Sequence, residues 1–339
     1  MNRAERMKLI SDIEKERGSK LLIYITGDRG GLETRISTDV FPFIFKHLSK
    51  IGNQEKIDLL IYTVGGITIA GYGLVNMIRE FCKSLNIIIP FKALSTGTLI
   101  ALGANEIIMS KLGQLSPIDP SLEHPLGPRI NLPNQPGIQA NVPISVEDVL
   151  SYFDLGKNEA NIKDTDSFIQ AFMKLSDNVH PLTLGAVNRI REQIKFLAKN
   201  LLSYHLDDEE KIKNIISILS KERFSHDYLI SRKEAKNTLG LNIVDISSNL
   251  ENKIFELFES YSDILELNNP LNYEVLLRDS DNIQTTFHRC IIESMDLTHT
   301  FDTELQIRRT TIAQPSISAP MTGYNAIIVR QGWILNNGI

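Results

Sequence analysis

The first 120 residues alternate between short apolar runs and amphipathic helical patterns, and this alternation limits the chain to a small set of folds. The apolar runs span residues 21–26, 57–63, 86–93 and 106–109. Runs this short and this apolar are typical of parallel strands that are buried on both faces. Helical patterns such as VFPFIFKHLSKI and ITIAGYGLVNMIREFCKSL lie between them. The alternation therefore predicts an α/β fold of repeated βα units on a mostly parallel sheet.

The pattern changes twice in the rest of the chain. Residues 116–145 hold seven of the thirteen prolines, which excludes a helix or a central strand and predicts a long loop. Helical patterns follow from Val146 to about Glu222. From about residue 251, one helix precedes β-rich segments such as TFHRCIIESM, FDTELQIRR and NAIIVRQGWIL. We therefore expect a main domain over residues 1–250 and a small α+β C-terminal extension over residues 251–339.

Composition excludes several classes of protein. A formal charge of -5 without a Lys/Arg cluster argues against a nucleic-acid partner. The seven histidines lack metal-ligand spacing, so no metal site is predicted. Cys82 and Cys290 are the only cysteines, which argues against a disulfide framework and for a reducing compartment. The charged N-terminus does not resemble a signal peptide, and no apolar run approaches the ~18 residues of a membrane span. We expect a cytoplasmic protein.

Gly65 and Gly66, in YTVGGITIAG, follow a predicted buried strand and precede a predicted helix. Two glycines allow a sharp turn that points backbone N–H groups into a cleft. A plain β-to-α turn is the alternative interpretation. A dinucleotide-binding loop is disfavoured because GxGxxG is missing, and a P-loop is excluded because GK[ST] is missing.

Ser95 ends the next apolar strand, in KALSTGTLIALGA. Ser95 or Thr96 could simply cap the following helix. However, the carboxyl ends of neighbouring parallel strands meet at one edge of a sheet, where open α/β folds bind ligands. We therefore expect the Gly65–Gly66 turn to lie beside Ser95.

The TVGG and ALSTG motifs, followed by TLIALGANEIIMSKLGQLSPIDPSL, resemble the serine dehydrogenase proteinase family, relatives of signal peptide peptidase A in the ClpP/crotonase superfamily. Members usually show PGG, an SAGT-like turn and a GPIDP-like segment, where this chain has VGG, STGT and SPIDP. The resemblance extends through VHPLTLGAVNR, SHDYLISRKEAKNTLGL and CIIESM. It implies a ClpP/crotonase-like fold with a C-terminal β-rich extension.

The resemblance also implies roles for individual residues. Ser95 would be the nucleophile of a serine endopeptidase, and Gly65, Gly66 and Thr96 would form the oxyanion hole. Backbone amides suit this role, because a tetrahedral acyl intermediate needs donors aimed at its developing negative charge. Gly97 would let the substrate carbonyl approach. No metal or organic cofactor is implied.

The general base is harder to assign. The segment PIDPS offers Asp119 but no histidine, and Asp227 falls about where the acid of a Clp-type triad would stand. In signal peptide peptidase A the base is a lysine, which by analogy would fall in KNEANIKDTDSFIQAFMK, the segment that holds Lys157, Lys163 and Lys174. We favour Lys163 and His180. For each candidate lysine a solvated surface position is the alternative, and for His180 it is a helix cap.

The sequence thus predicts a serine peptidase that hydrolyses peptide bonds through an acyl-enzyme on Ser95. The resemblance implies a peptide or protein substrate and a homo-oligomer. Two alternatives stay open: a crotonase-like acyl-CoA enzyme that uses the same glycine amides, and an inactive scaffold or regulatory protein of the same fold.

Overall fold

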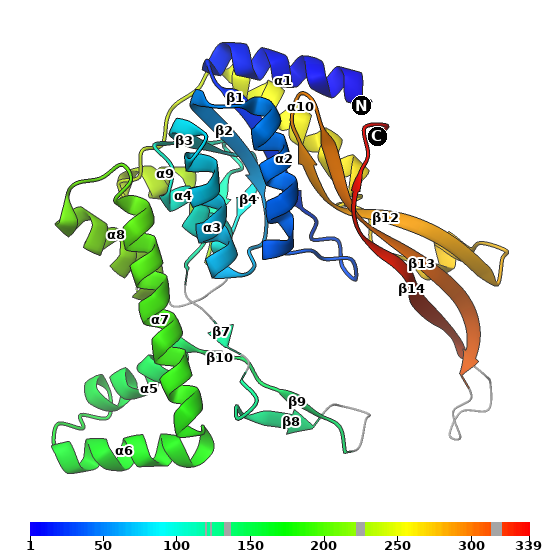
Figure 1. Ribbon diagram of the computed structural model, residues 1–339. Helices are drawn as coiled ribbons and strands as arrows, with labels where there is room; N and C mark the ends of the chain where they lie inside the picture. Colours follow the sequence, from blue (N-terminus) through cyan, green and yellow to red (C-terminus); the bar gives the residue numbers. More distant parts are fainter. Residues whose placement is uncertain (119–120, 123, 132–136, 222–227, 313–320) are drawn as a thin grey trace. The chain divides into compact units, whose positions relative to one another are not determined.

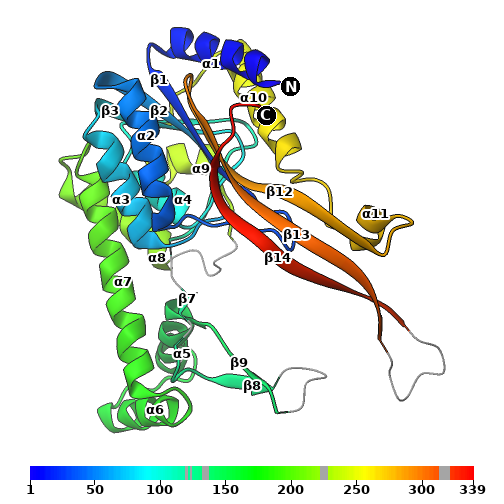
Figure 2. The same ribbon diagram turned by 45° about the vertical axis from the view of Figure 1, so that its right-hand side comes forward.

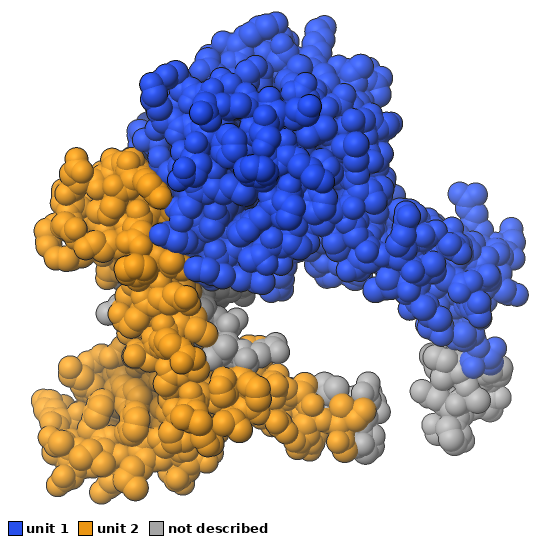
Figure 3. All heavy atoms as spheres, in the orientation of Figure 1, with its two compact units in different colours: residues 1–115, 230–339 blue, residues 116–229 orange. Residues whose placement is uncertain are grey.

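The computed structural model describes residues 1–118, 121–122, 124–131, 137–221, 228–312 and 321–339. The chain divides into two compact units (Figure 3). Unit 1 contains residues 1–115 and 230–339, and unit 2 contains residues 116–229. The boundary predicted after residue 250 falls inside a helix of unit 1. The division into a peptidase domain over residues 1–250 and an extension over residues 251–339 therefore stays a prediction.

Unit 1 is built on a seven-stranded sheet of order β14-β13-β12-β1-β2-β3-β5 (Figure 1). The pairs β1–β2, β2–β3 and β3–β5 are parallel, as predicted. The four strands contain the predicted apolar runs, and almost all of their apolar side chains are buried. They span Lys20–Thr26 (β1), Gln54–Tyr62 (β2), Cys82–Ile89 (β3) and Glu106–Met109 (β5). The run predicted over residues 86–93 is divided, because β3 ends at Ile89 and Lys92–Ala93 belongs to another sheet. The predicted α/β fold with a β-rich C-terminal part is confirmed.

The C-terminal β-rich part continues this sheet. Strand β12 pairs antiparallel with β1, in the register Ile23↔Glu293, and β13 and β14 follow as antiparallel neighbours. The far ends of these strands extend beyond the parallel half of the sheet (Figures 1 and 2). The strands span Asn282–Glu293 (β12), Thr298–Ile312 (β13) and Met321–Leu335 (β14).

Helices cover both faces of the sheet. Buried side chains of α1 and α10 pack on one face, including Ile10, Ile254 and Leu257, and α2 and α3 lie on the other (Figures 1 and 2). The helices of unit 1 span Arg3–Arg17 (α1), Thr38–Val40 (the 3-10 helix η1), Phe41–Ile51 (α2), Thr68–Arg79 (α3), Thr96–Leu102 (α4), Arg232–Asn237 (α9), Ser248–Ile264 (α10) and Tyr273–Leu277 (α11). A small second sheet joins Lys92–Ala93 (β4), Gln114–Leu115 (β6) and Ile230–Ser231 (β11).

Unit 2 begins in the proline-rich segment, where the structure describes only short strand pairs. These are Ser121–Leu122 (β7) with Ile144–Ser145 (β10), and Arg129–Asn131 (β8) with Gln139–Asn141 (β9). Four helices follow, as the sequence predicted: Val146–Asn158 (α5), Thr165–Asn178 (α6), Pro181–Leu202 (α7) and Glu209–Lys221 (α8). In the part of the chain that the structure describes, no helix is long and apolar enough to cross a bilayer.

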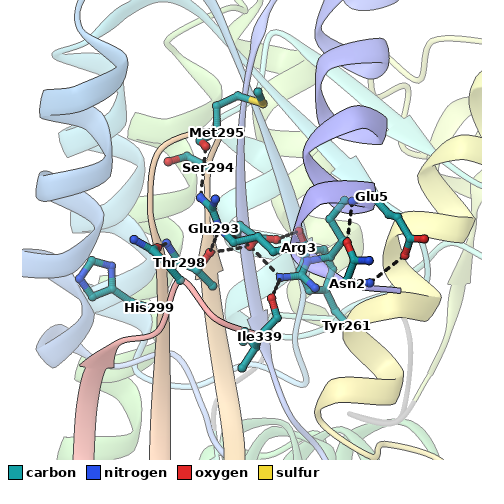
Figure 4. Close-up of polar contacts among 12 residues, drawn as sticks. Asn2, Arg3, Glu5, Tyr261, Glu293, Ser294, Met295, Thr298, His299 and Ile339 are labelled. Carbon is teal, nitrogen blue, oxygen red and sulfur yellow. Dashed lines mark hydrogen bonds and ion pairs between the residues drawn. The ribbon is translucent and has the colours of Figure 1, made fainter.

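A buried ion pair ties helix α1 to the sheet (Figure 4). The Arg6 guanidinium donates to both carboxylate oxygens of Glu293, at 2.8 and 2.9 Å, and both side chains are fully buried. Glu293 also accepts from the hydroxyls of Tyr261 (2.5 Å) and Thr298 (2.6 Å). Arg6 further donates to the Ile339 carbonyl at 2.9 Å. Helices α1 and α10, strands β12 and β13 and residue 339 thus share one buried polar cluster.

Breaking this cluster should destabilise the fold strongly. Removing one member of a buried pair leaves the other charge unpaired, which costs about 3–5 kcal/mol. We expect Arg6→Ala to lower the free energy of unfolding by this order, as measured by urea denaturation. Lys83→Ala is the matched control, because it removes the exposed Lys83–Glu55 pair and should change little. Equal effects of the two substitutions would contradict this account.

Two buried histidines lie where α2 meets the hairpin of strands β12, β13 and β14, here called the C-terminal hairpin. His47 Nδ1 is 2.8 Å from Ser294 Oγ, and His47 Nε2 is 3.0 Å from His299 Nδ1. Burial, and secondarily the neighbouring His299, lower the pKa of His47 from 6.5 to about 3. Burial, with a smaller contribution from Lys46, also lowers the pKa of His299. The folded protein therefore keeps the His47 imidazole neutral.

His47 should make the fold sensitive to acid. The unfolded chain protonates this imidazole near its ordinary pKa of 6.5, so protons favour the unfolded state. Above pH 6.5 the buried neutral His47 therefore costs the fold nothing. Between pH 6.5 and about pH 3 it lowers the free energy of unfolding by about 1.4 kcal/mol for each pH unit of acidification. The unfolding free energy is measured by urea denaturation between about pH 6.5 and pH 5. In His47→Gln its slope against pH should be smaller, by the amount that corresponds to about one proton bound on unfolding. An unchanged slope would show that His47 is not responsible.

Candidate active site

Two strand-end turns lie side by side in unit 1. The Thr63 N–H, just after β2, donates to the Lys92 carbonyl at 2.9 Å, and the Leu94 N–H donates to the Thr63 carbonyl at 3.0 Å. These bonds extend β2 alongside β4 for one more step. The Gly65–Gly66 turn and Ser95 are therefore brought together, as the sequence predicted from the two strand ends.

Gly65 is in contact with Ser95. A Cβ atom at Gly65 would lie 2.8 Å from Ser95 Cβ and 3.2 Å from Ser95 Oγ, and the backbone φ of Gly65 is 109°. Both facts require glycine here. The Gly65 N–H donates to Thr63 Oγ1 at 3.0 Å, and that hydroxyl also accepts from Thr26 Oγ1 at 2.8 Å. Because this amide is engaged, our assignment of the oxyanion donors narrows to Gly66 and Thr96.

Gly66 packs directly on an extended segment that the sequence analysis did not single out. Its φ is 155°, and a Cβ atom there would lie 2.3 Å from the Ile36 carbonyl oxygen. The Ile36 N–H donates to the Gly65 carbonyl at 2.9 Å, and the Ile36 carbonyl accepts from the Ile67 N–H at 2.8 Å. Ile36 thus fixes both ends of the glycine turn. Backbone bonds of this kind leave no signal in the type of side chain.

Ser95 has an unusual backbone conformation. Its φ is 52° and its ψ is -112°, a region that residues other than glycine rarely occupy and that costs about 1–3 kcal/mol. A serine at a sharp strand-to-helix turn of this kind is the arrangement that presents a nucleophile. Ser95 occupies the N-cap position of α4, yet among the described residues its side chain makes no capping hydrogen bond. The helix-cap interpretation therefore does not explain this hydroxyl.

Two backbone donors accompany Ser95. In the part of the chain that the structure describes, neither the Gly66 N–H nor the Thr96 N–H donates to an acceptor. Thr96 is the first residue of α4, where helix N–H groups lack intrahelical partners. The Thr96 hydroxyl donates to the Gly66 carbonyl at 2.8 Å and so holds the two residues together.

Gly97 has a packing role that the sequence did not predict. A Cβ atom at Gly97 would lie 2.6 Å from Thr63 Cγ2, so glycine is needed for α4 to pack against the end of β2. Gly71 of α3 has the same function toward Thr96, whose Cγ2 would lie 2.4 Å from an added Cβ. Close packing thus explains glycine at this position, and access of a substrate carbonyl stays a prediction.

An ion pair and a hydrogen bond stabilise the strand that leads to Ser95. The Lys92 ammonium donates to Asp28 Oδ2, and the Tyr62 hydroxyl donates to Asp28 Oδ1, both at 2.8 Å. Burial, and secondarily the Asp28 carboxylate, raise the pKa of Tyr62 far above its ordinary value, so the phenol stays protonated. Asp28 therefore joins the ends of β1, β2 and β4 on the sheet edge that carries Ser95.

The lysines proposed as general base belong to unit 2. Lys163, between α5 and α6, is exposed, as are Lys157 and Lys174. Lys174 lies 3.9 Å from Asp177, also at the surface. The assignment of Lys163 stays a prediction.

His180 also belongs to unit 2, where it is the N-cap of α7. Its Nδ1 accepts from the Leu182 N–H at 3.2 Å, which is the capping alternative considered from the sequence. Asp119 and Asp227 lie outside the described residues. The structure thus assembles Ser95, Gly65, Gly66 and Thr96 within unit 1, while both favoured candidates for the base are in unit 2.

Residues 2–132 match a family described as ClpP-like SDH-type serine proteinase. This range contains the glycine turn, Ser95 and the parallel strands that position them. Over these residues the chain is similar to that family. The ClpP-like fold expected from the sequence is thereby confirmed, and the family is one of serine proteinases.

Two relatives come from Methanocaldococcus jannaschii. The uncharacterized protein MJ0137 is 26% identical over 266 residues, which cover 76% of this chain and 78% of that protein. The uncharacterized protein MJ1495 is 25% identical over 268 residues, which cover 76% of each chain. A solved structure of a mutant of the 1510-N membrane-bound stomatin-specific protease aligns with a TM-score of 0.38 and 17% identity, and covers 70% of this chain and 85% of that one.

The contact between Gly65 and Ser95 can be tested by substitution. Gly65→Ala should lower the free energy of unfolding for two reasons. The positive φ costs a residue with a Cβ atom about 1–2 kcal/mol, and overpacking against Ser95 costs about 1–3 kcal/mol. Gly18→Ala is the matched control, because Gly18 also has a positive φ of 59° but has no atom within 4 Å of an added Cβ. We expect Gly65→Ala to lower the free energy of unfolding more than Gly18→Ala in urea denaturation. Equal losses would refute the close approach.

Proposed function

We propose that this chain hydrolyses peptide bonds through an acyl-enzyme on Ser95, with the Gly66 and Thr96 amides as oxyanion donors. The observation that carries the proposal is the backbone of Ser95, held at a positive φ in contact with Gly65, while the Gly66 and Thr96 N–H groups donate to no acceptor among the described residues. Strain of this kind persists where the surrounding structure imposes it, and it concentrates at functional sites. The serine proteinase family of residues 2–132 supports the same chemistry.

Each group has a distinct task in the proposed reaction. Ser95 Oγ attacks the carbonyl carbon of the scissile peptide bond, and a general base accepts the hydroxyl proton. The carbonyl oxygen becomes an anion, which the Gly66 and Thr96 N–H groups stabilise. The tetrahedral intermediate then expels the amine, which takes up a proton, and leaves the acyl group on Ser95. Water then attacks the ester carbonyl and gives its proton to the base. The second tetrahedral intermediate releases the acid, and Ser95 Oγ takes up the proton again.

The proposal also needs a group that accepts the proton of the Ser95 hydroxyl. Serine requires a base because its own pKa leaves almost no alkoxide at neutral pH. Lys163 and His180 are the candidates carried over from the sequence. A peptide or protein is the proposed substrate.

A fluorophosphonate probe tests the nucleophile, since it forms an adduct with an activated serine. We expect an adduct on Ser95 of the wild type, located by peptide mass spectrometry, and none on Ser95→Ala. Ser84→Ala is the control, because Ser84 lies on β3 away from the strand-end turns. No adduct on the folded wild type under any condition would overturn the proposal and favour the inactive scaffold.

The same assay addresses the base and the remaining alternative. Loss of the general base should slow labelling by about 10²–10⁴-fold, so Lys163→Ala and His180→Ala are compared with the control. An acyl-CoA enzyme would instead bind coenzyme A with an affinity that Ser95→Ala leaves unchanged. Binding of that kind, without an adduct on Ser95, would assign the glycine amides to the crotonase-like reaction.

A further inference from the structure

Strand β14 is an exposed apolar edge of the main sheet. Within the described residues it has a hydrogen-bonded neighbour on one side only, β13. Every residue from 324 to 331 is exposed, although the segment is rich in apolar side chains. Ile327, Ile328 and Val329 are consecutive, and their exposed fractions are 49%, 57% and 50%. Figures 1 and 2 show β14 running beside β13, and it is the last strand in the order of the sheet.

The edge carries little protection against pairing with another strand. Natural edge strands are usually short, charged or covered, because their free N–H and C=O groups form a template for a new strand. Strand β14 spans Met321–Leu335 and has one charged residue, Arg330. A bulge leaves Val329 without a partner on β13, which is a second protective feature beside the charge of Arg330. An apolar edge of this length indicates that another strand covers it.

We propose that β14 pairs antiparallel with β14 of a second copy of this chain, around a two-fold axis at Ile328. Two copies related by such an axis present the same edge to each other, so the strand must be complementary to its own reverse. The two seven-stranded sheets would then form one continuous sheet across the pair.

The sequence of β14 has this complementarity. In GYNAIIVRQGW, residues 323–333, the central Ile328 faces itself and Ile327 faces Val329. Asn325 faces Gln331, which joins two amide side chains. The outer positions join the aromatic ring of Tyr324 to Gly332 at both ends of the pair. Trp333, opposite Gly323, stays stacked on Phe43 of its own chain. Such aromatic–glycine pairs across strands are a recognised means of fixing register.

Charge selects the same register. With the axis at Ile328, Arg330 faces Ala326 of the second copy, so the like charges are apart. Moving the axis to residue 330 would place Arg330 opposite itself, and like charges directly opposite are destabilising. Moving it to residue 329 would place amide side chains opposite apolar or aromatic ones, because Gln331 would face Ile327 and Asn325 would face Trp333. The pattern therefore favours a second copy in one register over an unrelated strand.

Cysteine cross-linking tests both the partner and the register. In a Cys82→Ser background, which removes the half-buried thiol, Ile328→Cys should form a disulfide-linked dimer on mild oxidation, because the two Cα atoms lie within disulfide reach. Gln331→Cys alone is the matched control, since its two copies would lie about 20 Å apart along the strands. Mixing Asn325→Cys with Gln331→Cys should restore the cross-link.

Sedimentation of the full chain gives an independent readout. Ile328→Asp should convert the wild-type dimer to monomer at the same concentration, while its melting temperature as a monomer stays close to that of the wild type because the side chain is exposed. A monomeric wild type, an unchanged dimer in Ile328→Asp, or equal cross-linking of Ile328→Cys and Gln331→Cys would each overturn the proposal. Labelling of Ser95 is a separate measurement, so the two proposals can fail independently.

Discussion

The contact between Gly65 and Ser95 is the constraint on which the site depends. Two neighbouring βα units end in turns that approach until no Cβ atom fits between them. The approach requires β2 to continue past its end along β4, and it requires Ile36 to support the glycine turn from the other side. It also requires Gly71 and Gly97, because α4 must pack closely against α3 and the end of β2 for the Thr96 hydroxyl to reach the Gly66 carbonyl. One steric requirement therefore accounts for four glycines.

The fold was predicted where burial decides the residue type. Strands β1, β2, β3 and β5 are buried on both faces, so their sequences are continuously apolar and easily recognised. The place of β12–β14 was not predicted, because a hairpin pattern shows which faces are apolar and does not show which strand lies next to it. The deciding contact, Ile23↔Glu293, joins residues 270 positions apart, and the buried Glu293 that anchors it resembles any surface glutamate in the sequence.

The site was predicted in the same uneven way. The strand-end positions of Gly66, Ser95 and Thr96 follow from a simple rule about parallel sheets, and the structure brings them together. The engaged amide of Gly65 and the support from Ile36 depend on backbone hydrogen bonds, which any residue type can make. The candidates for the base belong to another unit, and no periodicity relates residues of unit 2 to a strand end in unit 1.

The buried Arg6–Glu293 cluster links the site to the proposed pairing of β14. Glu293 ends β12, which lies between β1 of the parallel half and β13 of the hairpin. Because Arg6 and Tyr261 hold Glu293 from α1 and α10, the hairpin is joined to the same core that positions Ser95. Pairing of two β14 edges would therefore connect two Ser95 sites through one continuous sheet. A substitution in the cluster would loosen the hairpin in each copy, so it should weaken pairing without altering a residue of the pairing edge.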